Sequence, residues 1–182
     1  METPAKHTIY TIGHSTHSED DFIGMLQSFA IKAVVDIRRF PGSRKYPWFN
    51  KEHLAAALQK AGISYVHLEA LGGRRQVQAH SRNNRWHNKS FQGYADYMET
   101  GDFEKGMTAL EAVAQQQPTA YMCSEAVWWR CHRSMVSDYL KAKGWTVLHI
   151  MAAGKAEEHP YTSPARIING HVFYSDINLF GQ

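Results

Sequence analysis

The chain has little sulfur, no long apolar run and little net charge. Two cysteines in 182 residues are too few for the disulfide framework of a small secreted domain. No apolar run approaches the roughly 18 residues that span a membrane, and the mean hydropathy is −0.46, so we expect no membrane insertion. The first ten residues lack the apolar centre of a signal peptide, and we therefore expect a cytoplasmic protein. A formal net charge of +3 is low for a protein that coats DNA.

Apolar, β-rich stretches alternate with stretches of helical periodicity. The length suits one core, so we expect residues 1–182 to form a single domain. The expected strands cover residues 7–15, 31–39, 64–73, 118–126 and 145–154. The expected helices cover residues 18–30, 50–62, 131–144 and two segments within 91–117, with Ser18, Asn50 and Asp102 as N-caps. This alternation predicts an α/β fold: a mainly parallel sheet of about five strands with helices on both faces, the three-layer arrangement of Rossmann-like and flavodoxin-like domains.

Reactive or conformationally special residues follow the carboxyl ends of all five expected strands. Right-handed crossovers bring those ends to one edge of the sheet, where open α/β sheets bind their ligands. We therefore expect one functional pocket at this edge. The residues concerned are Gly13, His14, Ser15, Asp36, Arg38, Arg39, Glu69, Gly72, Gly73, Cys123, Glu125, His149 and Gly154.

Several short stretches along nearly the whole chain resemble a single family. They are TIGHS, VVDIRRFPGSR, YVHLEALGG, CSEAVWWRCHR and HPYT. Taken together, these stretches resemble the domain of unknown function 488 family. The resemblance implies a compact α/β domain and marks the cysteine segment as the signature of the family. It implies no particular activity, because that family has no agreed biochemical function.

Both cysteines lie close together in the sequence, beside an acid, an imidazole and a guanidinium. Cys131 should lie at or just before the first turn of a helix, where free N–H groups, His132 and Arg133 favour a thiolate. Such a thiolate could be a nucleophile, a metal ligand or the redox partner of Cys123, and a buried structural thiol is the alternative. Glu125 would share a strand face with Cys123 and could serve, with His132, as a general base, or could pair with an arginine. The candidate catalytic residues are Cys123, Glu125, Cys131 and His132.

A basic segment follows the second expected strand. Between residues 38 and 85, ten lysines and arginines outnumber two glutamates, and aromatic residues lie among them. Guanidinium groups that clamp phosphate, beside rings that stack on bases, suit a nucleotide or a nucleic acid. A solvated basic surface is the alternative. The candidate substrate-binding residues are His14, Ser15, Asp36, Arg38, Arg39, Arg44 and Arg133.

Three functions are compatible with these patterns. The first is a thiol-dependent hydrolase or transferase that acts on a phosphate-bearing small molecule or a nucleic acid. The second is a metal-dependent enzyme or redox sensor in which Fe or Zn is held by Cys123, Cys131 and His14, with His132 as a further ligand. The third is a non-catalytic nucleic-acid-binding module. A P-loop and the usual dinucleotide fingerprint are not supported, because neither glycine motif is present.

Overall fold

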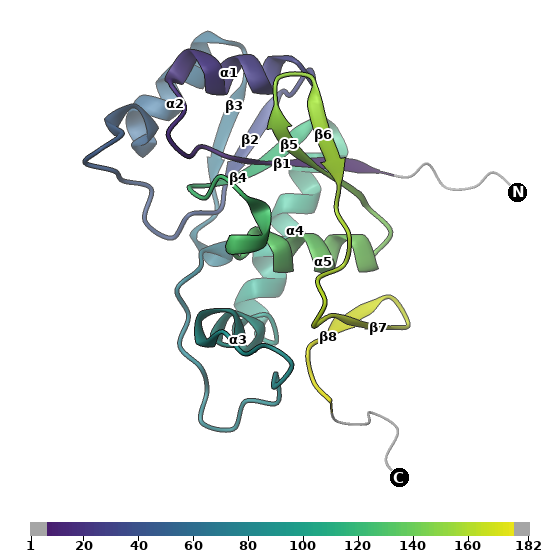
Figure 1. The fold of residues 1–182 in the computed structure, drawn as a ribbon. Helices are drawn as coiled ribbons and strands as arrows, with labels where there is room; N and C mark the ends of the chain where they lie inside the picture. The colour runs from purple at the N-terminus through teal and green to yellow at the C-terminus, as the bar shows by residue number, and fades with distance from the viewer. Residues whose placement is uncertain (1–6, 177–182) are drawn as a thin grey trace, which may run out of the picture.

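One six-stranded sheet, parallel except at one edge, organises the chain. The computed structural model describes residues 7–176, and the strand order is β3-β2-β4-β1-β5-β6 (Figure 1). The expected α/β class with a mainly parallel sheet is therefore confirmed. The parallel strands are β1 (Thr8–Gly13), β2 (Ala33–Asp36), β3 (Ser64–His67), β4 (Thr119–Cys123) and β5 (Thr146–Ala152), and the antiparallel edge strand is β6 (Lys155–Glu158).

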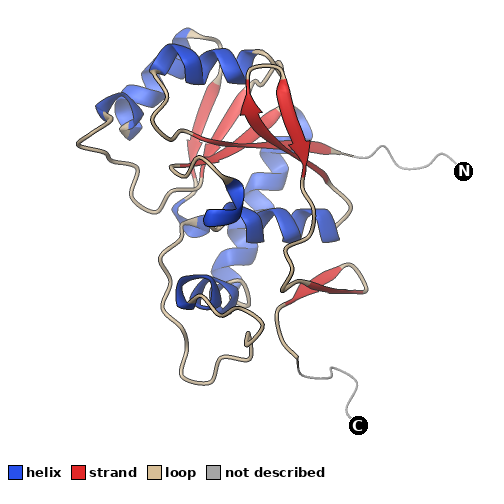
Figure 2. Cartoon of the chain, viewed as in Figure 1, coloured by secondary structure: helices blue, strands red, loops and turns tan. Residues whose placement is uncertain are grey.

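Helices cover both faces of this sheet (Figures 1 and 2). One face carries α1 and α2, and the other carries α4 and α5, with α3 beyond them. The helices are α1 (Glu19–Gln27), α2 (Lys51–Lys60), α3 (Lys89–Tyr97), α4 (Gly101–Gln116) and α5 (Arg133–Ala142). Short 3₁₀ turns lie in the loops after β2, β3 and β4: η1 (Pro47–Phe49), η2 (Glu69–Leu71) and η3 (Trp128–Arg130). None of the helices within residues 7–176 is long and apolar enough to cross a membrane.

Successive residues of the central strands contribute side chains to two separate hydrophobic clusters, one beneath each helical layer. In β2, Val34 belongs to the cluster with α1 and α2, whereas Val35 belongs to the cluster with α4 and α5. In β4, Met122 and Tyr121 divide between the two clusters in the same way. A sheet that is buried on both faces needs apolar side chains at consecutive positions. This requirement explains the near-continuous apolar runs of the sequence.

Two N-cap predictions agree with the structure, although the second cap works differently. Ser18 precedes α1, and its hydroxyl accepts the backbone N–H of Asp21 at 3.1 Å. Asn50 precedes α2, but its side-chain oxygen accepts the N–H of Ser43 instead of a helical N–H. This bond ties the basic loop to the start of α2.

Three local predictions are wrong. Thr100, not Asp102, caps α4, and its hydroxyl accepts the N–H of Phe103 at 3.3 Å. Asp102 lies inside the first turn, where its carboxylate complements the helix dipole. The last parallel strand also continues beyond His149, so that residue lies inside the sheet and away from its carboxyl edge. The strand ends at Ala152 and not at residue 154, and Gly154 follows it with a positive φ of 71° that turns the chain into β6.

A small hairpin, formed by β7 (Arg166–Ile168) and β8 (His171–Phe173), was not expected from the sequence. It packs beside α5 (Figure 1). Its strands are only three residues long, too short to show a clear alternation in the sequence. The hairpin places the last described strand, β8, against α5.

Candidate functional site

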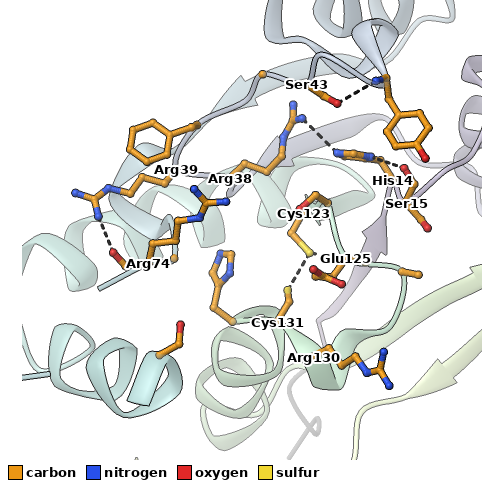
Figure 3. A pocket seen from close by; sticks show the side chains of 18 of the residues that line it. His14, Ser15, Arg38, Arg39, Ser43, Arg74, Cys123, Glu125, Arg130 and Cys131 are labelled. Carbon is orange, nitrogen blue, oxygen red and sulfur yellow. Dashed lines mark hydrogen bonds between the residues drawn. The ribbon is translucent and has the colours of Figure 1, made fainter. Parts of the chain in front are cut away.

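A cavity of about 590 Å³ opens at the carboxyl edge of β1, β2 and β4 (Figure 3). Its walls are loops that follow these strands, together with Gly73, Arg74 and part of α3. The volume lies in the range of small-molecule sites, which is roughly 300–1,000 Å³. The cavity therefore lies where the strand order predicts a ligand site.

The two thiols lie against each other at the base of this cavity. Their Sγ atoms are 2.9 Å apart, and both cysteines are free and buried. Burial alone would raise the pKa of Cys131, but the bond from Cys123, the charge of Arg133 and a backbone N–H lower it to about 7. Burial, followed by the bond to the other sulfur, raises the pKa of Cys123 well above its usual value. Cys123 is therefore the S–H donor, and Cys131 is the sulfur that ionises.

Arg133 supports this thiolate from behind. Its backbone N–H donates to Sγ of Cys131 at 3.2 Å, and its Nη2 donates to the carbonyl of Glu125 at 2.8 Å. The side chain is buried, and in residues 7–176 no carboxylate lies within ion-pair distance of its guanidinium. A buried charge without an ionic partner is costly. Ionisation of Cys131 offsets that cost, because it places an anion beside the guanidinium.

Gly13 allows the loop after β4 to approach β1 closely. A Cβ atom at this position would lie 1.7 Å from the carbonyl oxygen of Glu125 and 2.9 Å from Nη2 of Arg133. Any side chain here would displace the carbonyl that Arg133 binds. The glycine in TIGHS is therefore a packing requirement of the site.

Arg38 is fixed at the rim by two partners. Asp36 accepts bonds of 2.7–3.1 Å from Nε and Nη2 of Arg38, and it also accepts the hydroxyl of Tyr65 at 2.6 Å. Nη1 of Arg38 lies 3.4 Å from Nε2 of His14. Burial lowers the pKa of His14 to about 4, so its ring is neutral at pH 7 and Nε2 can accept from Arg38. Arg38 is consequently a rigid cation whose charge Asp36 compensates.

Three further arginines line the cavity: Arg39, Arg74 and Arg130. Nη1 of Arg39 donates to the backbone carbonyl of Arg74 at 2.7 Å. Within the described chain, none of the three forms an ion pair with a carboxylate. Figure 3 shows Arg39 and Arg74 on one side of the thiol pair and Arg130 on the other. Their uncompensated charges make the cavity a site for an anion.

His132 and Glu125, the two proton-transfer candidates, differ in their surroundings. The Nε2 of His132 donates to the carbonyl of Ile37 at 3.0 Å, and burial lowers the pKa of the ring. The imidazole is therefore neutral, and its Nδ1, which makes no hydrogen bond to residues 7–176, can accept a proton. Glu125 lies two residues beyond the end of β4, and its side chain is exposed. The prediction that it shares a strand face with Cys123 is wrong, and its carbonyl, not its carboxylate, binds Arg133.

The predicted substrate-binding residues fall into three groups. His14, Ser15, Arg38 and Arg39 line the cavity, as do the four candidate catalytic residues. Asp36 and Arg133 lie behind its wall, where they hold other side chains. Arg44 is exposed and does not line the cavity, although Ser43 just before it does. Arg74 and Arg130 line the cavity and were not singled out as ligand-binding residues; each had only a cluster of neighbouring cations as a sequence signal.

The proposed metal set does not assemble. Among the residues that the structure describes, no three His, Cys, Asp or Glu side chains are placed to hold a metal ion together. Nε2 of His14 faces Arg38, and Nε2 of His132 faces a backbone carbonyl. The Fe or Zn alternative therefore has no support from the side-chain geometry.

Comparison with known proteins identifies a family but no activity. The model of the family described as "Domain of unknown function DUF488" matches residues 18–140, which is most of the chain. No curated protein and no solved structure matches the chain.

Proposed function

The chain belongs to the DUF488 family of unknown function, and from its site we propose that the protein is a cysteine-dependent enzyme that acts on a phosphate-bearing substrate. Cys131 is the nucleophile, and the substrate is a nucleotide or the end of a nucleic-acid strand. One observation carries this proposal: a thiol with a pKa of about 7 lies in a cavity whose walls carry three arginines that form no ion pair with a carboxylate of residues 7–176.

The lining of the cavity supports a ligand with both an anionic and an aromatic part. Guanidinium groups bind phosphate through paired hydrogen bonds. Rings of Phe40, Tyr46, Phe91 and Tyr94 lie in the same lining, and Phe40 is 63% exposed. An aromatic ring with an open face can stack on a base. A mononucleotide has a phosphate for the arginines and a base for the aromatic rings, and its size suits the volume of the cavity.

The thiol chemistry follows from the two sulfurs and the neutral imidazole. The Cys131 thiolate attacks an electrophilic carbon or phosphorus of the substrate, and the leaving group departs with the bonding electrons. Water then cleaves the resulting thiol adduct, and Nδ1 of His132 accepts its proton. This second step restores the thiolate and releases the product. The reaction is a hydrolysis, and it becomes a transfer if an alcohol or amine replaces water.

Ligand binding and thiol protection test this proposal together. We expect AMP to bind in isothermal titration calorimetry and to slow the alkylation of Cys131 by iodoacetamide, whereas adenosine does neither. Arg74→Ala and Arg130→Ala should each weaken AMP binding by about tenfold, since a hydrogen bond to a charged group contributes roughly 1.5–3 kcal/mol. Arg44→Ala is the matched control, because Arg44 is exposed and lies outside the cavity.

Two results would count against the enzyme. Equal binding of AMP and adenosine would remove the phosphate requirement. Salt-sensitive binding of a single-stranded oligonucleotide that leaves Cys131 unprotected would favour a nucleic-acid-binding module instead.

The contact between the sulfurs favours a second candidate function, a dithiol redox protein. At 2.9 Å, Cys123 is placed to resolve an oxidised Cys131. Hydrogen peroxide would transfer one oxygen atom to the Cys131 thiolate, which becomes a sulfenic acid, and its second oxygen would leave as hydroxide and take up a proton to form water. The Cys123 thiol would then displace water from the sulfenic acid to form a disulfide. Intact mass spectrometry after treatment with hydrogen peroxide tests this candidate: loss of two hydrogens that dithiothreitol restores supports it, and stable addition of oxygen excludes it.

A further inference from the structure

Behind the thiol pair, an unbroken line of buried hydrogen bonds joins Arg133 to Asp138. The Nη1 of Arg133 donates to Oγ1 of Thr11 at 3.1 Å, and this oxygen lies 2.6 Å from Nδ1 of His149. The line continues from Nε2 of His149 to Nδ1 of His159 at 2.8 Å, and from Nε2 of His159 to Oδ1 of Asp138 at 2.8 Å. All five residues are buried. We refer to them as the Asp138 relay.

The two ends of the Asp138 relay fix the direction of the bonds that they make. A guanidinium can only donate and a carboxylate can only accept, so Arg133 donates to Oγ1 of Thr11 and Nε2 of His159 donates to Asp138. Burial lowers the pKa of His149 to about 2, which keeps that ring neutral with one donor and one acceptor nitrogen. One nitrogen of His149 therefore donates and the other accepts, so the ring bonds to both Thr11 and His159.

The far end of the Asp138 relay is anchored from several directions. Asp138 also accepts bonds from the backbone and hydroxyl of Thr162, and from the hydroxyl of Tyr174 at 2.8 Å. The indole of Trp128 stacks on His149, with ring centroids 4.7 Å apart and planes 5° from parallel. His149 therefore has little freedom to rotate, and Thr11 must meet it at a fixed point. This anchoring extends through Thr11 to the guanidinium.

The relay ends on a guanidinium whose near partners are all uncharged. Arg133 contacts the Thr11 hydroxyl and the Glu125 carbonyl, while the carboxylate of Asp138 is three groups away. The relay thus fixes the orientation of Arg133 without placing a negative charge beside it. The positive charge remains available to the sulfur of Cys131.

We propose that Thr11, His149, His159 and Asp138 are positioning residues that aim the Arg133 guanidinium at the thiol pair. The inference deepens the proposed function, because it rests on Cys131 as the reactive thiol. None of the four residues touches the cavity; they act only through Arg133. Loss of any link leaves Arg133 free to turn from the thiolate and makes Cys131 less reactive at neutral pH.

The test is the pH profile of Cys131 alkylation in matched threonine variants. Thr11→Val keeps the shape of the side chain and removes the hydroxyl, so we expect iodoacetamide to modify Cys131 about fivefold more slowly at pH 7, with the profile shifted to higher pH. Thr11→Ser restores the hydroxyl and should restore the profile. Thr119→Val is the control, since Thr119 is equally buried on β4 but bonds to the carbonyl of Gln117, outside the relay. Trypsin cleavage after Arg130 separates the two cysteines for mass spectrometry.

A second variant, at another residue of the relay, shows whether the slower alkylation comes from breaking the relay or from valine itself. His149→Phe keeps a ring against Trp128 but removes both ring nitrogens. If both residues act through one relay, the variant that combines Thr11→Val with His149→Phe should be no slower than the slower single variant. An unchanged profile in folded Thr11→Val, or a shift that Thr11→Ser does not reverse, would overturn the proposal.

The outcomes separate this proposal from the proposed function. Alkylation of Cys131 needs no substrate, so the relay can fail while AMP still binds and protects the thiol. Conversely, a shifted profile in a protein that binds no phosphate would support the relay and count against the proposed substrate.

Discussion

Two buried aspartates hold two arginines of the site, Arg38 in the cavity wall and Arg133 behind it, and they do so differently. Asp36 binds Arg38 directly, through hydrogen bonds of 2.7–3.1 Å. Asp138 reaches Arg133 only through His159, His149 and Thr11. The direct pair lies at the cavity wall, and the Asp138 relay lies in the interior between β1, β5 and α5.

The distance between the aspartate carboxylate and the guanidinium group decides what each arginine can do. A carboxylate in contact with a guanidinium compensates its charge, so Arg38 is a rigid hydrogen-bond donor with little net field. A carboxylate three groups away orients Arg133 but leaves its charge uncompensated. Arg38 therefore suits the binding of a ligand, whereas Arg133 suits the stabilisation of a thiolate. Burial keeps two of the histidines neutral: His14, which contacts Arg38, and His149, which belongs to the Asp138 relay.

The largest expected effect concerns the stability of the direct pair. Asp36→Asn leaves the buried guanidinium of Arg38 without a counter-charge, and we expect the free energy of unfolding to fall by about 3–5 kcal/mol. Asp138→Asn removes one carboxylate oxygen that accepts hydrogen bonds but breaks no direct arginine pair, so about 1–3 kcal/mol should be lost. Urea denaturation followed by circular dichroism measures both. Equal losses would mean that the relay compensates charge as well as a direct contact does.

The next effect concerns the reactivity of Cys131. Arg133→Lys keeps the charge but cannot reach the thiol, the Thr11 hydroxyl and the Glu125 carbonyl together, so alkylation at pH 7 should slow by about tenfold. Arg38→Lys is the matched control, because the charge of Arg38 is already compensated by Asp36. Alkylation rates by mass spectrometry decide the matter. A similar slowing in both variants would remove the distinction between the two arginines.

The smallest effect is a shared sensitivity to acid. In the unfolded chain a histidine binds a proton below pH 6.5, whereas folded His14 and His149 do so only near pH 4 and pH 2. The unfolded state therefore gains protons first, and stability falls as the pH drops below 6.5. We expect a loss of about 0.7 kcal/mol for each of these histidines between pH 7 and pH 6.

Removal of either histidine measures its share of this loss. Folded His14→Gln and folded His149→Gln should each flatten the dependence of the unfolding free energy on pH by about the same amount. Both histidines are unprotonated in the folded protein between pH 6 and pH 7, because their pKa values are about 4 and about 2. A slope unchanged in both variants would show that other groups govern the acid sensitivity.

The sequence predicted the architecture of the fold well because local patterns set it. Apolar runs and helical periodicity identified the five parallel strands and the helices between them, and the strand ends identified the edge where the cavity opens. Prediction was weaker where the outcome depended on a single turn. His149 was expected at the edge because nothing nearby marks the hairpin into β6 except Gly154.

The sequence alone determined that two cysteines, an imidazole and several arginines would meet at one sheet edge. Only the tertiary structure decided which of them face the cavity and which stand behind it. Thr11 and His149 are 138 residues apart and meet because the register of β1 and β5 pairs them. Arg133 reaches Thr11 because α5 packs across that face of the sheet. Contacts between residues so distant in sequence arise from sheet register and helix packing, which no local pattern encodes.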